Sequence, residues 1–212
     1  MHIDTEIISV DQKKFKESEL TPAGIAIRAG LVVAFPTDTF YGLGADPFNL
    51  AAVERVYQIK GRPRSKPLLL LIDDVEQTTM LTAELPDSFD ELAREFWPGP
   101  LTIVMRASHR LPLKVTGGTG NIGLRMPNSK LARALIHSAG VPLTATSANL
   151  STLPSCTTAS QVLGQIGGRV DMLIDGGTVL ADKPSTVVDL TGPSIKIIRE
   201  GVIGKSKLKK WL

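Results

Sequence analysis

A run of apolar residues directly follows a basic, proline-containing segment, and this junction constrains the fold more than any other part of the sequence. The apolar run covers residues 68–72, and its length is typical of a buried strand. The preceding segment, 60–67, contains four cations, two prolines and a glycine, which disfavour a helix. Because the strand fixes one end of this loop, we expect the cations to occupy a defined place and to form an anion site. Phosphate is the commonest anion that requires several cations at once.

The composition is that of an ordinary globular protein. Of the 212 residues, 42% are hydrophobic and 21% are charged, which is ample material for a core. The formal net charge of +3 permits an anionic partner without requiring nucleic acid. The single cysteine, Cys156, excludes an internal disulfide framework and a cysteine-rich zinc site. No apolar run approaches the ~20 residues of a membrane helix and no signal peptide is visible, so we expect a cytoplasmic protein without membrane contact.

Helical and strand patterns alternate along the chain, which predicts an α/β fold with a mixed sheet. We expect strands at residues 3–10, 31–35, 68–72, 101–105, 121–125, 141–145, 171–174, 186–190 and 195–199. We expect helices at residues 20–29, 49–58, 73–80, 87–96, 129–139 and 159–166. The segment 36–46 is expected to be a loop in which the two glycines indicate close backbone approach or a bulge. No composition break divides the chain, so 1–212 is predicted to be one domain, with a frayed, solvated basic tail at 205–210.

Several patterns that often mark a nucleotide, metal or thiol site do not indicate one in this sequence. The pattern GxGxxG occurs at 118–123, but the residues that follow it open no helix, so a dinucleotide-binding site is rejected. There is no GxxxxGK[ST] phosphate loop. The three histidines show no metal-ligand spacing, and we expect no protein metal site. Cys156 has no histidine or acid nearby in the sequence to activate it and is interpreted as a bystander.

Polar clusters lie beside the predicted strands, at residues 37–41, 60–66, 125, 147–149 and 185–186, with Arg199 as a further candidate. Each cluster alone has an ordinary explanation as turn residues, helix caps or surface cations. Loops beside parallel strands tend to converge on one crevice. Together the clusters supply hydroxyls, amides and cations, with Asp38 as the one acid. Such a set suits a bound anionic nucleotide and charge stabilisation at phosphorus, where catalysis is mostly positioning and electrostatics.

Six segments resemble, in order, motifs of the YrdC/Sua5 family of threonylcarbamoyl-AMP synthases, and they extend over residues from about 20 to 202. They are PTDTFYGLG at 36–44, KGRPRSKPL at 60–68, WPGPLT at 97–102, RMP at 125–127, TSAN at 146–149 and STVVDLTG at 185–192. The resemblance implies a twisted mixed sheet flanked by helices, with an open, positively lined concave face. It also implies the short, single-domain form of the family.

The resemblance implies an activity as well. The family forms L-threonylcarbamoyl-AMP and pyrophosphate from L-threonine, bicarbonate and ATP, with Mg²⁺ expected on the nucleotide. A downstream threonylcarbamoyl transferase complex then modifies N6 of adenosine 37 in tRNAs that read codons beginning with A. The attacking group is an N-carboxylate made from threonine and bicarbonate. Because that group is already anionic, the step requires no general base from the protein.

Matching positions imply the roles of individual residues. ATP would be bound by Lys60, Arg62, Lys66, Ser147, Asn149 and Arg199, the first two forming the catalytic triphosphate clamp. Threonine would be bound by Thr39, Arg125 and Ser185. An arginine at 125 suits a carboxylate because its planar group can donate two parallel hydrogen bonds. Leu71 stands where some members have a histidine, and this departure concerns one side of the threonine pocket.

Two alternatives remain open. A double-stranded RNA-binding module of the same fold would use the basic face without catalysis, although the modest charge and the scattered hydroxyls argue against RNA as the main ligand. A weak interaction with tRNA or double-stranded RNA is compatible with either activity. The second alternative is a paralogue, or a carbamoyl-adenylate domain such as that of hydrogenase maturation proteins. Those domains belong to longer chains with zinc-finger and acylphosphatase segments, which this sequence lacks.

Overall fold

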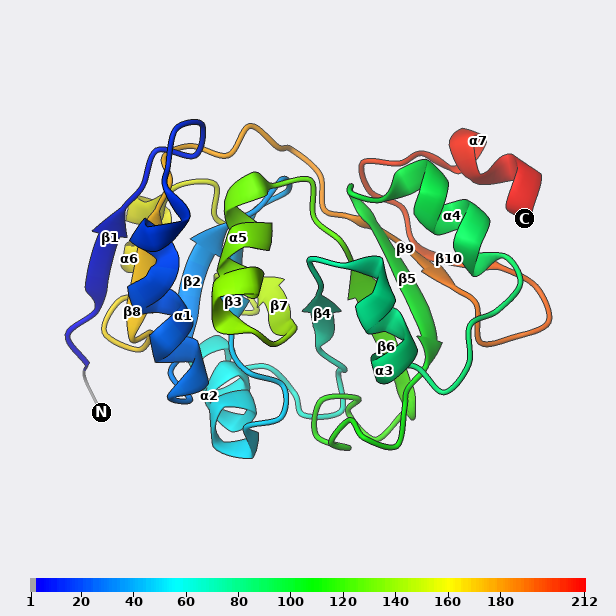
Figure 1. Ribbon diagram of the computed structural model, residues 1–212, viewed down its shortest axis with the longest axis horizontal. Helices are drawn as coiled ribbons and strands as arrows, with labels where there is room; N and C mark the ends of the chain where they lie inside the picture. Colours follow the sequence, from blue (N-terminus) through cyan, green and yellow to red (C-terminus); the bar gives the residue numbers. More distant parts are fainter. Residues whose placement is uncertain (1–2) are drawn as a thin grey trace.

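The computed structural model describes residues 3–212 and is built around a twisted, unclosed sheet (Figure 1). Its strands are β1 (Glu6–Ser9), β2 (Val33–Pro36), β3 (Tyr41–Gly44), β4 (Leu69–Leu71), β5 (Leu101–Arg106), β6 (Asn121–Arg125), β7 (Leu143–Ser147), β8 (Met172–Asp175), β9 (Thr186–Asp189) and β10 (Lys196–Arg199). Its α-helices are α1 (Thr21–Arg28), α2 (Leu50–Lys60), α3 (Thr78–Leu81), α4 (Phe89–Phe96), α5 (Lys130–Ala139), α6 (Ala159–Ile166) and α7 (Lys205–Leu208). Short 3-10 helices are η1 (Glu17–Leu20), η2 (Val75–Gln77) and η3 (Lys209–Trp211).

The sheet is mixed, as predicted. The strand order is β1-β8-β2-β3-β7-β4-β6-β5-β9-β10. Strands run parallel in the pairs β1–β8, β8–β2, β4–β6 and β5–β9, and antiparallel in the other neighbouring pairs. The predicted helix and strand types are confirmed for most segments, with ends that differ by a few residues. Across residues 3–212, no helix combines the length and the apolar character that crossing a membrane requires.

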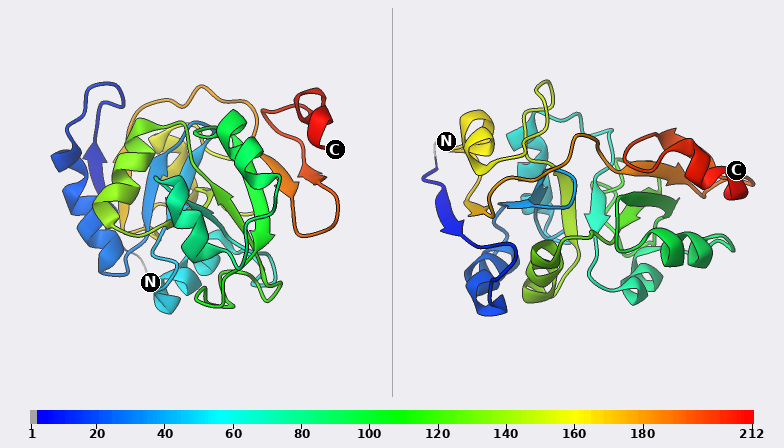
Figure 2. Two further views of the ribbon diagram at one scale, coloured as in Figure 1. Left: turned by 45° about the vertical axis from the view of Figure 1, so that its right-hand side comes forward. Right: turned by 90° about the horizontal axis from the view of Figure 1, so that it is seen from above.

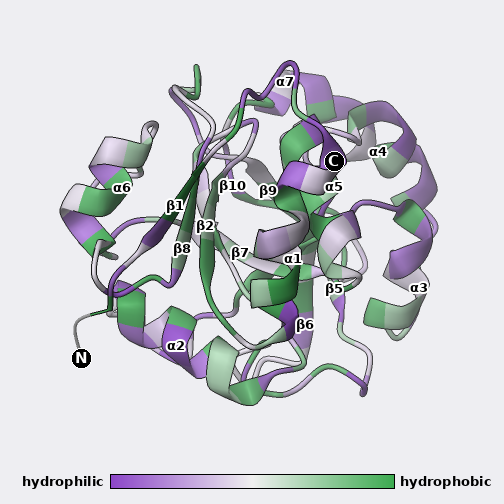
Figure 3. Cartoon of the chain, turned by 60° about the vertical axis from the view of Figure 1, so that its left-hand side comes forward, coloured by the Kyte–Doolittle hydropathy of each residue, from purple (hydrophilic) through white to green (hydrophobic). Residues whose placement is uncertain are grey.

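Helices cover the two halves of the sheet differently. Helices α1, α3, α4 and α5 lie on one side of the sheet, and α6 lies on the other (Figure 2). The half around β2 and β8 has apolar side chains on both faces, and β2 is hydrophobic along its length (Figure 3). In the half formed by β4, β6, β5 and β9, side chains alternate between core and cavity. Ile103 and Leu124 belong to the core, whereas Thr102 and Gly123 line a cavity.

Strand β3 was not predicted, because residues 36–46 were expected to be a loop. The chain instead turns at residues 37–40 and returns antiparallel to β2, with Pro36 opposite Tyr41. The expected close approach at a glycine is found at Gly44, where a Cβ atom would lie 2.7 Å from the Phe35 ring. A glycine is therefore required at position 44, where the Phe35 ring occupies the space of a side chain, and it removes the alternating side-chain pattern that would have indicated a strand.

The ends of several helices are fixed by side chains that the sequence identifies. Asn49 accepts hydrogen bonds from the amides of the first turn of α2, and Ser129 does the same for α5. Gly61 and Gly140 end these two helices with positive φ angles of 58° and 70°. Because α2 stops at Gly61, the basic loop begins at a defined point beside the sheet.

The lysine-rich tail is ordered, and the prediction of a frayed, solvated terminus was wrong. Residues 205–211 form α7 and η3, and Leu208 is buried with 1% exposure. The Trp211 ring meets Phe96 of α4 edge to face, with centroids 5.4 Å apart. The Trp211 indole Nε1 donates to Glu91 Oε2 at 3.1 Å. The packing of Leu208 and Trp211 therefore orders this segment despite the charge of its four lysines.

Candidate functional site

A cavity of about 520 Å³ lies on the open face of the sheet, above β4, β6, β5 and β9. Part of its lining consists of small residues, which leave room for a ligand beside larger ones such as Leu69 and Leu71. Gly123 has no room for a larger residue without displacing Thr102, whose Cγ2 would lie 3.1 Å from an added Cβ. Gly42 and Ala145 also line the cavity. In β5 and β6 the alternation directs Ile103 and Leu124 into the core and leaves Thr102 and Gly123 facing the cavity.

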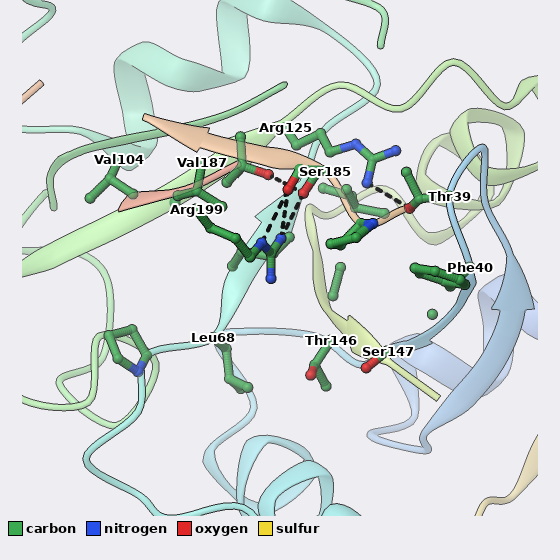
Figure 4. Close-up of a pocket in the computed structure, with 18 of the residues that line it drawn as sticks. Thr39, Phe40, Leu68, Val104, Arg125, Thr146, Ser147, Ser185, Val187 and Arg199 are labelled. Carbon is green, nitrogen blue, oxygen red and sulfur yellow. Dashed lines mark hydrogen bonds between the residues drawn. The ribbon is translucent and has the colours of Figure 1, made fainter. Parts of the chain in front are cut away.

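Six of the nine predicted site residues meet around this cavity: Thr39, Arg62, Arg125, Ser147, Ser185 and Arg199. Arg125 and Arg199 lie beside Ser185, with Thr146 and Ser147 across from them in the view of Figure 4. The predicted convergence of strand-end loops is therefore found. Within residues 3–212, the other three predicted residues, Lys60, Lys66 and Asn149, are not among those that line the cavity.

Lys60 is the last residue of α2 and is buried with 3% exposure. Its ammonium donates to the carbonyl of Ser147 at 2.5 Å, the carbonyl of Asn149 at 2.8 Å and Asn149 Oδ1 at 3.1 Å. Burial, followed by the charge of Arg62, lowers the pKa of Lys60 to about 8. Since an ammonium has three N–H groups, its donors are all occupied by the segment that carries Ser147. This geometry differs from the expectation that Lys60 lies on the triphosphate.

The basic loop 61–67 is fixed by its backbone, as expected from its position before β4. The Tyr57 hydroxyl lies 3.0 Å from the carbonyls of both Lys66 and Lys114. Arg62 donates from Nε to the Lys66 carbonyl at 3.3 Å and from Nη2 to the Pro67 carbonyl at 2.8 Å. The Lys66 side chain is exposed, and Arg64 pairs with Glu54 outside the cavity. Of the three cations in residues 61–67, Arg62 is the one that lines the cavity.

Arg125 ends β6 and is held on three sides. Its Nε donates to the Gly99 carbonyl at 3.0 Å, its Nη1 to Thr39 Oγ1 at 3.0 Å and its Nη2 to Asp38 Oδ1 at 2.5 Å. The side chain is 5% exposed. The Gly99 carbonyl comes from the WPGPLT segment, and Asp38 and Thr39 come from the turn between β2 and β3. Three of the segments that were singled out in the sequence therefore meet at one guanidinium.

Ser185, which directly precedes β9, and Arg199, at the end of β10, form a second cluster. The Ser185 hydroxyl lies 2.9 Å from Thr102 Oγ1. Arg199 donates from Nε and Nη2 to the Ser185 carbonyl, at 3.1 and 2.9 Å, and from Nη2 to Ser185 Oγ at 3.1 Å. These contacts fix the Arg199 guanidinium beside Ser185, where it lines the cavity (Figure 4).

The cavity is electropositive. Burial lowers the pKa of Arg62, and burial together with the charges of Arg125 and Arg62 lowers the pKa of Arg199. Arginines keep their charge at neutral pH despite such shifts. Among the described residues, Asp189 is the one acid that lines the cavity, against three guanidinium groups. The arrangement therefore favours a ligand with several negative charges.

Sequence reasoning missed several polar lining residues, including Thr102, Asn121 and Asp189. Asn121 lies on the same strand as Arg125 and four residues before it, so the two-residue period places both on one face. The same period within β5 could have identified Thr102. The GxGxxG pattern at 118–123 runs into strand β6 rather than a helix, which confirms the rejection of a dinucleotide site there.

Among the described residues, the site contains neither a cluster of metal ligands nor a reactive thiol. In the part of the chain that the structure describes, no three histidine, cysteine, aspartate or glutamate side chains cluster as metal ligands. Cys156 is buried, and its burial raises the pKa of the thiol. A buried thiol with a raised pKa is a poor nucleophile.

Comparison with protein families gives one match over most of the chain. The family model Sua5_yciO_yrdC, described as "Telomere recombination", matches residues 25–201. The threonylcarbamoyl-AMP synthase of Pyrococcus abyssi (strain GE5 / Orsay) is 39% identical over 97% of this chain and 60% of its own length. That of Bacillus subtilis (strain 168) is 38% identical over 94% of this chain and 58% of its own length. The chain thus spans about 60% of the length of these two relatives.

Solved structures agree with this match. The crystal structure of P. abyssi Sua5 complexed with L-threonine superposes with a TM-score of 0.95 at 39% identity, covering 98% of this chain and 61% of that chain. The crystal structure of E. coli YciO superposes with a TM-score of 0.85 at 26% identity, covering 99% of this chain and 100% of that chain. The fold predicted from the motifs, a twisted mixed sheet flanked by helices, is confirmed.

Proposed function

The chain belongs to the Sua5/YciO/YrdC family, as its motifs predicted, and from this membership we propose that it is an L-threonylcarbamoyladenylate synthase. The proposed reaction forms threonylcarbamoyl-AMP and pyrophosphate from L-threonine, bicarbonate and ATP. The observation that supports it most is the convergence of three arginines and several hydroxyls on one cavity with a single lining acid. A relative whose structure contains L-threonine supports the choice of amino acid.

Threonine is proposed to bind at the Arg125 end of the cavity. The guanidinium would receive the amino-acid carboxylate, because bidentate pairing with arginine is strong and directional. Thr39 Oγ1 lies 3.0 Å from Arg125 Nη1 and so stands beside that carboxylate. Ser185, which directly precedes β9, would contact the amino acid across from the turn that carries Thr39.

ATP is proposed to bind along the arginines and Ser147. Arg62 and Arg199 would contact the phosphates, and the Ser147 hydroxyl would contribute a further hydrogen bond. Lys60 and Asn149 are proposed to act through Ser147, because the Lys60 ammonium is buried and donates to both residues. Lys66, which is exposed, is proposed as an outer contact.

The charges of the substrates and of the lining arginines indicate how the proposed reaction would proceed. The amine of threonine combines with bicarbonate, releasing water, to give an N-carboxylate. An oxygen of that carboxylate attacks the α-phosphorus of ATP, and the bond to pyrophosphate breaks. Arg62 and Arg199 would neutralise the charge on the leaving group, while Arg125 would hold the carboxylate of the amino acid in place.

The proposed reaction needs no general base from the protein, because the attacking oxygen carries a negative charge already. Mg²⁺ is usually held by one or two carboxylates together with substrate phosphates. Asp189, the one acid that lines the cavity in the described chain, is the residue that would hold it. When bound, Mg²⁺ would supply additional charge neutralisation on the phosphates.

Broader aspects of the function are proposed on the same basis. The product would pass to a threonylcarbamoyl transferase complex that modifies tRNA, which places the expected site of action in the cytoplasm. The motif-bearing core at about 20–202 would act as one domain with the rest of chain 1–212. No observation on the site or its relatives favours the double-stranded RNA-binding alternative, and weak RNA binding would be incidental.

Pyrophosphate release tests the proposal. The protein is incubated with ATP, bicarbonate, Mg²⁺ and single amino acids, and pyrophosphate is measured in each reaction. We expect release with L-threonine and little with L-valine, which has nearly the same shape without the hydroxyl. No release with any amino acid, or release only when RNA is added, would refute the proposal.

A further inference from the structure

The turn between β2 and β3 is rigid and presents two side chains to Arg125. The Thr37 hydroxyl donates to the Phe40 carbonyl at 2.7 Å and accepts from the amides of Thr39 and Phe40 at 3.1 and 3.3 Å. The Thr37 amide also donates to the Phe40 carbonyl, at 3.2 Å. With its backbone fixed in this way, the turn sets the positions of Asp38 and Thr39 relative to β6.

Asp38 is the charge partner of Arg125. Their side chains are 13% and 5% exposed, and Nη2 lies 2.5 Å from Oδ1. Among the ion pairs of residues 3–212, this is the one in which Arg125 takes part. Arg62 and Arg199 place further positive charge around the same cavity. A buried guanidinium in such surroundings needs a carboxylate to hold it in one place.

Asp38 and the proposed substrate lie on different sides of the turn. Arg125 and Thr39 line the cavity of about 520 Å³, whereas Asp38 lines a second, more open cavity of about 770 Å³. Thr37 borders both cavities. The second cavity is otherwise formed by residues 10–13, 128–131 and 176–180. Asp38 therefore reaches Arg125 from behind and does not occupy the space in which the amino acid would bind.

The donors of Arg125 allow both contacts at once. A guanidinium has five N–H groups. Three of them donate to Gly99, Thr39 and Asp38. The other two, one on each terminal nitrogen, have no acceptor among the described residues and remain available for an incoming carboxylate. Asp38 can thus keep its contact while a ligand binds.

We propose that Asp38 is a positioning residue for amino-acid binding, which holds the Arg125 guanidinium from the far side so that its two free N–H groups face the cavity. This inference rests on the proposed function, because it takes the amino-acid carboxylate as the ligand of Arg125. It predicts that Asp38 affects the binding of threonine and not that of ATP. Arg62 and Arg199, the proposed phosphate contacts, are held by the backbone carbonyls of the basic loop and of Ser185 instead.

The test compares threonine and ATP in variants of Asp38. Asp38→Asn keeps the size of the side chain and removes its charge, and Asp46→Asn is the matched control, because Asp46 follows β3 and its Oδ1 accepts from the Phe48 amide instead. We expect Asp38→Asn to raise the KM for threonine about tenfold, which is the usual size of a lost charged hydrogen bond, with less than about twofold change in the KM for ATP. Asp46→Asn is expected to change neither KM.

A second measurement uses calorimetry to compare the binding of L-threonine to Asp38→Asn, to Arg125→Lys and to the double variant that carries both substitutions. If Asp38 acts through Arg125, Asp38→Asn adds little to the effect of Arg125→Lys, so the two effects are not additive. Asp38→Glu keeps the charge and should lie between wild type and Asp38→Asn, and it takes the place of Asp38→Asn in both measurements if the asparagine variant does not fold. An unchanged or lowered threonine KM, an equal rise for ATP, or full additivity with Arg125→Lys would overturn the proposal. A wild-type protein without threonine-dependent activity would refute the proposed function instead.

Discussion

The Lys60 ammonium donates to both the carbonyl and the side-chain Oδ1 of Asn149, at 2.8 and 3.1 Å, so the end of α2 is tied to the segment that follows β7. The Ser151 amide donates to the Lys60 carbonyl at 2.9 Å and adds a backbone contact between the same segments. Asn149 in turn donates from Nδ2 to the carbonyls of Leu150 and Leu153. The contacts between Lys60 and Asn149 therefore hold the segment that carries Ser147 in place beside the cavity.

Replacing Lys60 by methionine should destabilise the fold and abolish activity. The variant leaves the carbonyls of Ser147 and Asn149 buried without donors, which costs about 1–3 kcal/mol for each unsatisfied group, reduced by local relaxation. Urea unfolding measures the loss, and pyrophosphate release measures the activity. Lys66→Met, at an exposed position in the same loop, is the control and should stay within about 0.5 kcal/mol of wild type. A Lys60→Met protein with wild-type stability would show that the hydrogen bonds of Lys60 to Ser147 and Asn149 do not stabilise the fold.

The lowered pKa of Lys60 predicts a pH dependence of stability. Burial lowers the pKa from 10.5 in the unfolded chain to about 8 in the folded protein. Between these values the unfolded state binds more protons, so the contribution of Lys60 to the unfolding free energy becomes more favourable as the pH rises through this window. Well below pH 8 both states are protonated and the contribution is constant.

This dependence is isolated by comparison with Lys60→Met. The unfolding free energy of wild type relative to the variant should be flat from about pH 6.5 to 7.5 and should then increase toward pH 10, measured by urea unfolding at each pH. A difference that falls over this range would mean that the three hydrogen bonds to the ammonium outweigh its burial.

The ordered tail predicts a stability effect at Leu208, which is not among the residues that line the cavity. Leu208 is 1% exposed and packs in the main core, so Leu208→Ala should lower the unfolding free energy by about 2–4 kcal/mol. Leu212, which is 46% exposed, provides the control, and Leu212→Ala should change stability by less than about 0.5 kcal/mol. Equal stability of the two variants would show that the tail does not contribute to folding.

Much of the fold could be predicted from the sequence, because the periodicity of apolar residues reports which face of each element is buried. The exceptions have physical causes. Strand β3 has glycines at alternate positions, because Phe35 occupies the space of a side chain at Gly44, and this hides the strand pattern. The prediction for the tail was wrong because four lysines outnumber its apolar residues, although Leu208 is buried in the main core and Trp211 packs against Phe96 of α4.

The candidate site was predictable in its residues but not in their geometry. Side-chain chemistry and motif order identified Thr39, Arg62, Arg125 and Ser185, which do lie together. Sequence alone could not show that the Lys60 side chain turns into the protein, because α2 and β7 are far apart in the chain and the direction of a lysine at a helix end depends on its acceptors. The pairing of Asp38 with Arg125 across 87 positions is unpredictable for the same reason.

The last prediction concerns the geometry of Arg125 itself. Lysine at this position keeps the charge but offers a single nitrogen, so it cannot donate to Gly99, Thr39 and Asp38 and also form two parallel bonds to a carboxylate. Arg125→Lys should raise the KM for threonine by roughly tenfold or more and change the KM for ATP much less. Steady-state pyrophosphate release at varied threonine and ATP measures both constants. Arg133→Lys is the control, because Arg133 lies on α5 and donates to the Pro127 carbonyl outside the cavity lining of the described chain. Equal increases for the two substrates would mean that Arg125 does not distinguish the amino acid from the nucleotide.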